Sequence, residues 1–167
     1  MHNKLTQSDI RKMEEEIEHR KLVVRKEALE AVKEARAQGD LSENFEYYAA
    51  KRDKNKNESR IRYLERMIKT AQIVEDTSAE DEVGLYNTVE IYFEEEDEVE
   101  VYRVVTTVRG NTLSGSISIE SPLGRAILGK KTGDRVFVRI NDTAGYYVQI
   151  RSIEKTTDDG TDKLRSY

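Results

Sequence analysis

The stretch Gly39-Asp40-Leu41-Ser42-Glu43-Asn44-Phe45-Glu46-Tyr47-Tyr48 separates two long segments in which apolar residues have helical spacing. The spacing predicts one helix over 7–38 and a second over 43–74. Gly39 suits the end of the first helix, because glycine readily adopts the left-handed conformation that follows many helices. The stretch contains three acidic residues and no basic one. We therefore expect a helical hairpin whose turn presents carboxylates.

The apolar residues of both segments recur at three- and four-residue steps, which place them on one narrow side of each helix. They are Ile10, Met13, Ile17, Val24, Ala28, Val32 and Ala35 in the first segment and Ile61, Leu64, Ile68 and Ala71 in the second. This pattern is typical of an antiparallel two-helix coiled coil closed by a short connection. Residues 51–60 contain no apolar side chain, so we expect weak packing there.

After residue 84 the apolar pattern changes to alternation, which predicts strands. Residues 136–140 and 146–150 alternate on either side of Asn141-Asp142-Thr143-Ala144-Gly145, a composition that favours a hairpin turn. A short helix is predicted after Ser121 as its N-cap, with Pro122 in the first helical position and Gly129 past the end. The second half is therefore expected to be a small antiparallel sheet with one short helix.

These patterns divide the chain into four parts and give an α+β fold class. We predict a coiled-coil finger over residues 1–75, an acidic linker over 76–84 and a globular domain over 85–154. The polar residues 155–167 are expected to form a frayed tail.

The charge is distributed unevenly between the two halves. Residues 1–74 hold 17 Lys and Arg against 14 Asp and Glu, whereas the remainder holds 11 against 19, for a formal net charge of -5. Between Thr70 and Tyr102 every charged residue is acidic. This asymmetry predicts two modules with different roles.

Composition excludes several classes of protein. The chain has no cysteine and two distant histidines, His2 and His19, so neither a disulfide nor a self-contained transition-metal site is expected. No apolar run approaches the ~20 residues that span a bilayer. The N-terminus lacks the pattern of a secretory signal, and we expect a cytoplasmic protein without membrane contact.

Asp40 and Glu43 allow two interpretations. Their spacing fits a variant of the capping box at the start of a helix, and spacing alone favours this structural explanation. Alternatively, two exposed carboxylates can occupy one or two positions on Mg²⁺. The chain has no phosphate-binding glycine loop and no set of residues for a complete active site, so another molecule would have to supply the remaining ligands.

Residues 34–47 resemble the pattern E-A-R-x-x-G-D-L-x-E-N-x-E-Y of the GreA/GreB family of bacterial transcript cleavage factors. Residues 117–130 resemble the family's C-terminal pattern I-S-x-x-S-P-x-x-R-x-L-x-G-K, and residues 59–74 resemble the end of its second arm. The resemblance covers about residues 5 to 154. It implies a coiled-coil finger and an FKBP-like C-terminal domain.

The resemblance also implies a function and a partner. In this family the finger enters the secondary channel of bacterial RNA polymerase and helps the polymerase's own active site bind its second Mg²⁺, which stimulates cleavage of backtracked RNA near its 3′ end. The factor is then not an enzyme by itself, and Mg²⁺ is shared with the polymerase. Asp40 and Glu43 would direct the metal, whether or not they also cap the helix. Leu41, Ser42 and Asn44 would position the tip.

Two further features bear on this function. The second arm carries the basic residues Lys51, Arg52, Lys54, Lys56 and Arg60. They form either a solvated face or a contact with RNA or the channel wall, because phosphate attracts positive charge. Phe45 stands where the family commonly has a small residue, which would tighten the packing of the tip or hinder its entry. The alternative function is a channel-binding inhibitor that does not stimulate cleavage. A prolyl isomerase is a weak third hypothesis, because fold does not carry function.

Overall fold

The computed structural model describes residues 3–39, 44–109, 115–160 and 162–166. They belong to two compact units, one consisting essentially of residues 8–71 and the other of residues 4–7 and 72–167. Across these described ranges, no helix is long and apolar enough to cross a membrane.

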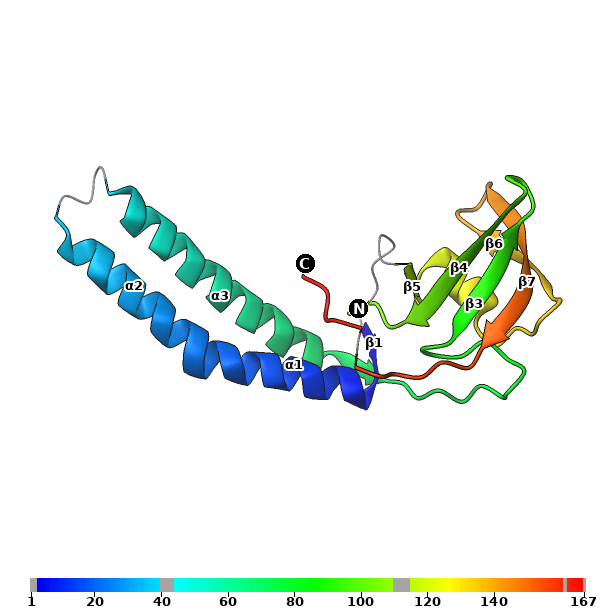
Figure 1. The fold of residues 1–167 in the computed structure, drawn as a ribbon, viewed down its shortest axis with the longest axis horizontal. Coiled ribbons are helices and arrows are strands. Elements are labelled where there is room, and N and C mark those ends of the chain that lie inside the picture. Colours follow the sequence, from blue (N-terminus) through cyan, green and yellow to red (C-terminus); the bar gives the residue numbers. More distant parts are fainter. Residues whose placement is uncertain (1–2, 40–43, 110–114, 161, 167) are drawn as a thin grey trace. The chain divides into compact units, whose positions relative to one another are not determined.

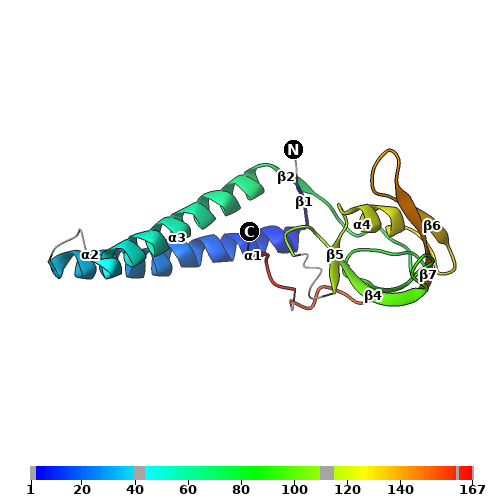
Figure 2. The same cartoon turned by 90° about the horizontal axis from the view of Figure 1, so that it is seen from above.

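The first unit is a helical hairpin, as predicted (Figure 1). Its first arm consists of α1 (Gln7–His19), the π-helical turn η1 (Arg20–Val24) and α2 (Arg25–Ala37), which follow one another without a break. Its second arm is α3 (Phe45–Lys69). Both Figure 1 and Figure 2 show α2 and α3 side by side. The short strands β1 (Asn3–Leu5) and β2 (Ala71–Ile73), which precede the first arm and follow the second in sequence, pair with each other.

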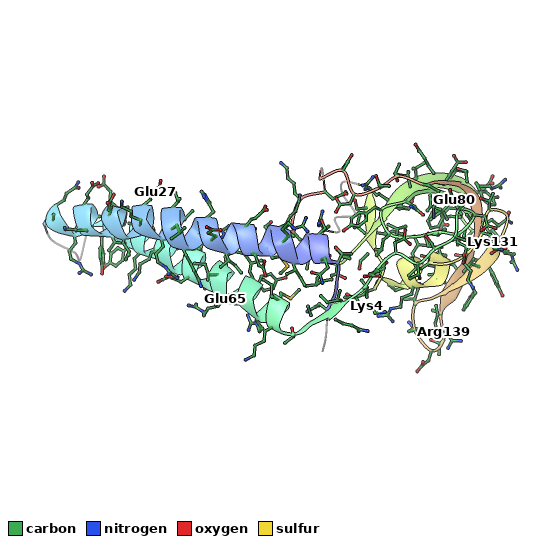
Figure 3. All side chains as sticks on the ribbon, turned by 90° about the horizontal axis from the view of Figure 1, so that it is seen from below. Lys4, Glu27, Glu65, Glu80, Lys131 and Arg139 are labelled. Atoms are coloured by element: carbon green, nitrogen blue, oxygen red, sulfur yellow. The ribbon has the colours of Figure 1, made fainter. Side chains whose placement is uncertain are left out.

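Buried apolar side chains of the hairpin lie towards both of its ends. Met13 of α1 and Ile61 and Leu64 of α3 are buried towards the open end, and Ala35 of α2 is buried near the turn. Charged side chains cover the outer surface of the arms, where Figure 3 labels Glu27 and Glu65. The narrow buried strip and charged exterior are those of a two-helix coiled coil, because only one side of each helix has a partner.

The middle of the hairpin is polar, but its packing is specific. Asn57 of α3 donates from Nδ2 to the carbonyl of Arg20 (3.2 Å), and Arg20 donates back to Asn57 Oδ1 (3.1 Å). Arg25 forms two parallel hydrogen bonds to Glu58, at 2.8 and 2.9 Å. The expectation of weak packing around residues 51–60 is therefore wrong. Hydrogen bonds replace apolar contact, and Asn57 is bonded to the first residue of the π-helical turn.

The second unit contains a five-stranded sheet in the order β5-β4-β3-β7-β6. The strands are β3 (Thr88–Phe93), β4 (Glu98–Val105), β5 (Ser116–Ser118), β6 (Arg135–Arg139) and β7 (Gly145–Glu154). The pairs are antiparallel as expected, except that β4 and β5 run parallel, which makes the sheet mixed. The α+β class with one short helix is confirmed.

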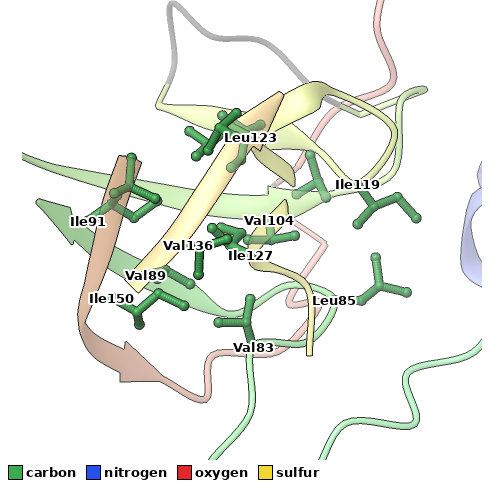
Figure 4. Close-up of a cluster of buried hydrophobic side chains, with 14 of the residues drawn as sticks. Val83, Leu85, Val89, Ile91, Val104, Ile119, Leu123, Ile127, Val136 and Ile150 are labelled. Atoms are coloured by element: carbon green, nitrogen blue, oxygen red, sulfur yellow. The ribbon is translucent and has the colours of Figure 1, made fainter. Parts of the chain in front are cut away.

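The core of this unit lies between one face of the sheet and helix α4 (Pro122–Ile127). Figure 2 shows α4 beside the curved sheet, and Figure 4 shows Val89, Ile91, Val104 and Ile150 from the sheet gathered around Ile127 of the helix. The capping signals were predicted correctly. Ser121 Oγ accepts from the backbone N–H of Gly124 (3.1 Å), Pro122 begins the helix, and Gly129 has a φ of +81°.

Two segments that composition suggested to be loose are attached to the sheet unit. Val83, in the expected linker, is fully buried, and its N–H donates to the carbonyl of Lys130 (2.8 Å). Beyond β7, Lys155 donates to the carbonyl of Glu82 (2.8 Å), and Thr156 Oγ1 donates to that of Tyr86 (2.5 Å). The expectation of a frayed tail does not fit these contacts. These contacts are made by polar side chains, so the polar composition of the segment did not indicate that it is attached.

Candidate functional site

The closed end of the hairpin is organised by Asn44. This residue is the N-cap of α3, and its Oδ1 accepts from the backbone N–H of Tyr47 (3.0 Å). Its Nδ2 donates to the carbonyl of Ala35 in the last turn of α2 (2.6 Å). One amide side chain thus satisfies an N–H at the start of one helix and gives a second donor to the Ala35 carbonyl at the end of the other, which also accepts from the N–H of Gln38 (3.2 Å).

This arrangement corrects the capping-box interpretation. Helix α3 begins at Phe45 with Asn44 as its cap, so Asp40 is not the cap and Glu43 is not in its first turn. Asp40, Leu41, Ser42 and Glu43 lie outside the described residues. In sequence they fill the connection between Gly39, which has a φ of +118°, and Asn44. Their role as metal-directing and tip-positioning residues stays a prediction.

Aromatic side chains and one arginine surround the described part of the tip. The Arg36 guanidinium lies 5.6 Å from the centre of the Tyr47 ring and donates a long hydrogen bond of 3.4 Å to the Tyr47 hydroxyl. This hydrogen bond lowers the pKa of Tyr47, although partial burial acts in the opposite direction. The pair joins α2 to α3 next to Asn44. Sequence reasoning used both residues only as parts of a motif and missed their contact.

Phe45 is 84% exposed and therefore does not tighten the packing of the tip. Tyr48, one turn further on, is also largely exposed. Both rings are available to a partner, and the consequence of Phe45 for entry into a channel stays a prediction. An aromatic ring left in water at the start of a helix contributes little to folding.

The predicted basic face separates into two groups. Lys51, Arg52 and Lys56 are exposed on α3, and Lys54 is half-buried. Arg60 differs, because it is buried and donates hydrogen bonds to both Glu16 oxygens, at 2.8 and 3.3 Å. It is therefore engaged between the arms and does not belong to the candidate contact surface for RNA or the channel wall.

The ion pair at Glu16 is a structural element of the hairpin. Burial pushes the pKa of Glu16 upward, but hydrogen bonds from Arg60 and from Arg20 (2.7 Å) outweigh it and hold the pKa below its usual value. The lowered pKa means that the folded hairpin favours the ionised carboxylate. Charge alone could not distinguish Arg60 from its exposed neighbours, because the distinction depends on Glu16, 44 residues away.

The chemistry of the tip fits a hard cation only in part. Among the residues that the structure describes, no group of three or more His, Cys, Asp or Glu side chains could hold a metal ion. Asp40 and Glu43 add two carboxylates, which are ligands of the type that Mg²⁺ prefers but too few to complete its six-coordinate shell. The donor set suits a magnesium ion that another molecule already binds.

Comparison with known proteins defines the class. Residues 3–73 match the family model described as "Transcription elongation factor, N-terminal", and residues 78–155 match "Transcription elongation factor, GreA/GreB, C-term". The chain therefore belongs to the GreA/GreB family of transcription elongation factors, which confirms the resemblance seen in the sequence.

Within the family, the chain is a homologue of GreA. It is 44% identical over 153 residues to transcription elongation factor GreA of Streptococcus pneumoniae serotype 19F (strain G54), covering 91% of this chain and 95% of the relative. The same values apply to GreA of Streptococcus sanguinis (strain SK36). Among solved structures, GreA factor homolog 1 (Gfh1) of Thermus thermophilus is 27% identical, with a TM-score of 0.43, covering 92% of this chain and 99% of that one.

Proposed function

We propose that this protein stimulates the endonucleolytic cleavage of backtracked RNA by bacterial RNA polymerase. The finger enters the secondary channel of the polymerase, and its tip meets the active site and the RNA 3′ end. The single observation that carries the proposal is that the family motif with Asp40 and Glu43 falls, in the sequence, between the ends of two paired helices in a GreA homologue.

The residues of the finger have separate tasks in this proposal. Asp40 and Glu43 would supply carboxylate oxygens to a magnesium ion that the polymerase holds in part, and the ion, when bound, would supply Lewis-acid assistance to hydrolysis of the RNA backbone. Leu41 and Ser42 shape the turn. Asn44 fixes the turn to both helices through its hydrogen bonds to Tyr47 and Ala35. The polymerase contributes the catalytic site, so the protein is not an enzyme by itself.

The exposed basic residues of α3 supply a second contact, with the RNA. Lys51, Arg52 and Lys56, with the half-buried Lys54, give the arm positive charge close to the turn. Such a face attracts the phosphates of the displaced RNA end, and this contribution weakens as salt concentration rises. Further from the turn, charged residues pair with each other, as Lys21 does with Glu65 (2.6 Å).

The test uses a stalled, backtracked elongation complex with a labelled RNA 3′ end. The wild-type protein should release short 3′ fragments faster than buffer does, and Asp40→Asn and Glu43→Gln should each lose most of this stimulation. Glu27→Gln is the matched control, because Glu27 is an exposed acid of α2 away from the turn. Full stimulation by both tip variants would contradict the proposal.

The same elongation complex distinguishes cleavage stimulation from the alternative function, inhibition by channel binding. If the protein slows nucleotide addition and releases no fragments, it is a channel-binding inhibitor. In that case Phe45→Ala tests whether the exposed ring prevents a productive position of the tip.

A further inference from the structure

The residues that follow β7 fold back onto the sheet unit and form a strap, defined here as the described residues of 156–165. Thr156 begins the strap: its carbonyl accepts from Asn87 Nδ2 (3.1 Å), and its hydroxyl lies 2.9 Å from that of Thr88. Near the other end, the N–H of Arg165 donates to the carbonyl of Val108 (2.6 Å). The strap is thus attached at one end to Asn87 and β3 and at the other to the turn that follows β4.

Two arginines hold the middle of the strap. The Arg109 side chain is 0% exposed, and its NH1 donates to Asp158 Oδ1 (3.3 Å) and to the carbonyl of Asp162 (3.3 Å). Arg103 donates from Nε to Asp162 Oδ2 (3.0 Å) and from NH2 to the carbonyl of Thr157 (2.6 Å). Each arginine therefore binds both a carboxylate and the peptide backbone of the strap.

Tyr86 forms the floor of this site. Both guanidiniums lie over its ring, at 5.6 Å for Arg109 and 5.9 Å for Arg103. Tyr86 is 7% exposed and has a φ of +66°, a conformation that costs a bulky residue energy and persists only where the surroundings impose it. The ring and the two arginines therefore form a fixed receptor and not a chance contact of mobile side chains.

The receptor and the strap differ in two respects. Arg103, Arg109 and Tyr86 lie in the part of the chain that matches the family model, whereas that match ends at residue 155, before the strap begins. None of the described strap residues is fully buried. A polar segment with so little buried surface can detach at a small fraction of the free energy of global unfolding.

A detached strap would remove the carboxylate and carbonyl partners of Arg103 and Arg109, so another acidic segment could take their place. We propose that Arg103, Arg109 and Tyr86 form a binding site for an acidic peptide, which the strap occupies in cis and which an acidic segment of a partner protein can occupy in its place. The spacing of Asp158 and Asp162 defines the ligand as a segment with carboxylates four residues apart in sequence.

The contacts favour a peptide over a nucleic acid. Besides the two carboxylates, the receptor binds the backbone carbonyls of Thr157 and Asp162, and Asn87 binds that of Thr156. A phosphate chain can satisfy the charge of the arginines but offers no amide carbonyls at these positions. Binding of RNA is therefore an outcome that the experiment must distinguish.

The experiment opens the site in the full chain with Asp158→Asn/Asp162→Asn. The probe is a fluorescent peptide with the sequence of residues 155–166, and its anisotropy reports binding. The opened variant should bind the peptide about tenfold more tightly than the wild type, since the wild-type strap competes at a high effective concentration. Asp142→Asn/Glu95→Gln removes the same charge from exposed positions elsewhere and should behave like the wild type.

Two comparisons complete the test. A peptide with both aspartates changed to asparagine should bind the opened variant at least about tenfold more weakly, because charged hydrogen bonds are lost. Adding Arg103→Gln to the opened variant should also weaken binding of the original peptide. Equal affinity of the wild type and the opened variant, no binding to either, or tighter binding of an oligouridylate of matched charge than of the peptide would each overturn the proposal.

Discussion

At the scale of single residues, Asn44 links the two arms at the closed end of the hairpin, because its amide group bonds to both helices. Asn44→Ala removes the N-cap and the link to Ala35, so we expect a loss of about 1–2 kcal/mol in the free energy of unfolding. Asn44→Asp keeps the cap acceptor and should recover part of that loss. Urea denaturation followed by circular dichroism measures both.

The control for this substitution is Asn55→Ala, which changes the same residue type at an exposed position of α3. It should leave stability within about 0.5 kcal/mol of the wild type. If Asn44→Ala were as stable as Asn55→Ala, the role of Asn44 in joining the two helices would be wrong.

Glu16 should make the stability of the hairpin sensitive to acid. Its pKa in the folded protein lies below the ordinary value of 4.5, so the carboxylate contributes stability above that value, which is lost as the pH falls through the lowered pKa. Glu16→Gln should therefore show less change in melting temperature between pH 6 and pH 3 than the wild type. An identical pH dependence of the two proteins would count against the ion pair with Arg60 and Arg20.

At the scale of elements, the π-helical turn η1 depends on a partner in the other arm. Asn57 is 3% exposed, and its amide bonds to both the carbonyl and the guanidinium of Arg20. Asn57→Ala removes both hydrogen bonds, although the Arg20 carbonyl keeps the N–H of Arg25 and the guanidinium keeps Glu16, and we expect a loss of about 1–3 kcal/mol. Hydrogen exchange should also become faster around residues 20–25. Unchanged exchange there would show that η1 is a local property of the first arm.

The local signals of the sequence predicted most elements correctly. The hairpin followed from apolar spacing, helix α4 from Ser121, Pro122 and Gly129, and the β6–β7 hairpin from its turn composition. In that turn Asn141 Oδ1 accepts from the N–H groups of Thr143 and Ala144, at 2.9 and 2.8 Å. Each of these features is decided by residues close together in the chain.

The features that the sequence did not predict depend on distant residues. The π-helical turn is bonded to Asn57, 37 residues further on, and the strap is held by Arg103 and Arg109, which lie 59 and 49 residues before the aspartates they bind. The choice of Asn44 over Asp40 as the cap is a different case. Both residue types cap helices well, so propensity could not choose between them. The orientation of Asp40 and Glu43 is still a prediction from the family motif.

At the scale of the whole molecule, function is proposed to depend on a metal ion shared with the polymerase. The described residues provide a stable hairpin with Asn44 at its closed end but no metal site of their own. A protein that supplies two carboxylates to a weakly held ion should change the concentration of Mg²⁺ that the reaction requires. It should do so without binding Mg²⁺ tightly when alone.

The most direct measurement is therefore the rate of RNA cleavage in a backtracked complex as a function of Mg²⁺ concentration. The wild-type protein should lower the Mg²⁺ concentration for half-maximal cleavage, whereas the double variant Asp40→Asn/Glu43→Gln should leave it at the value of the polymerase alone. Glu27→Gln should match the wild type. If the double variant lowers the requirement for Mg²⁺ as much as the wild type does, the two acids do not share the metal, and the proposed mechanism is wrong.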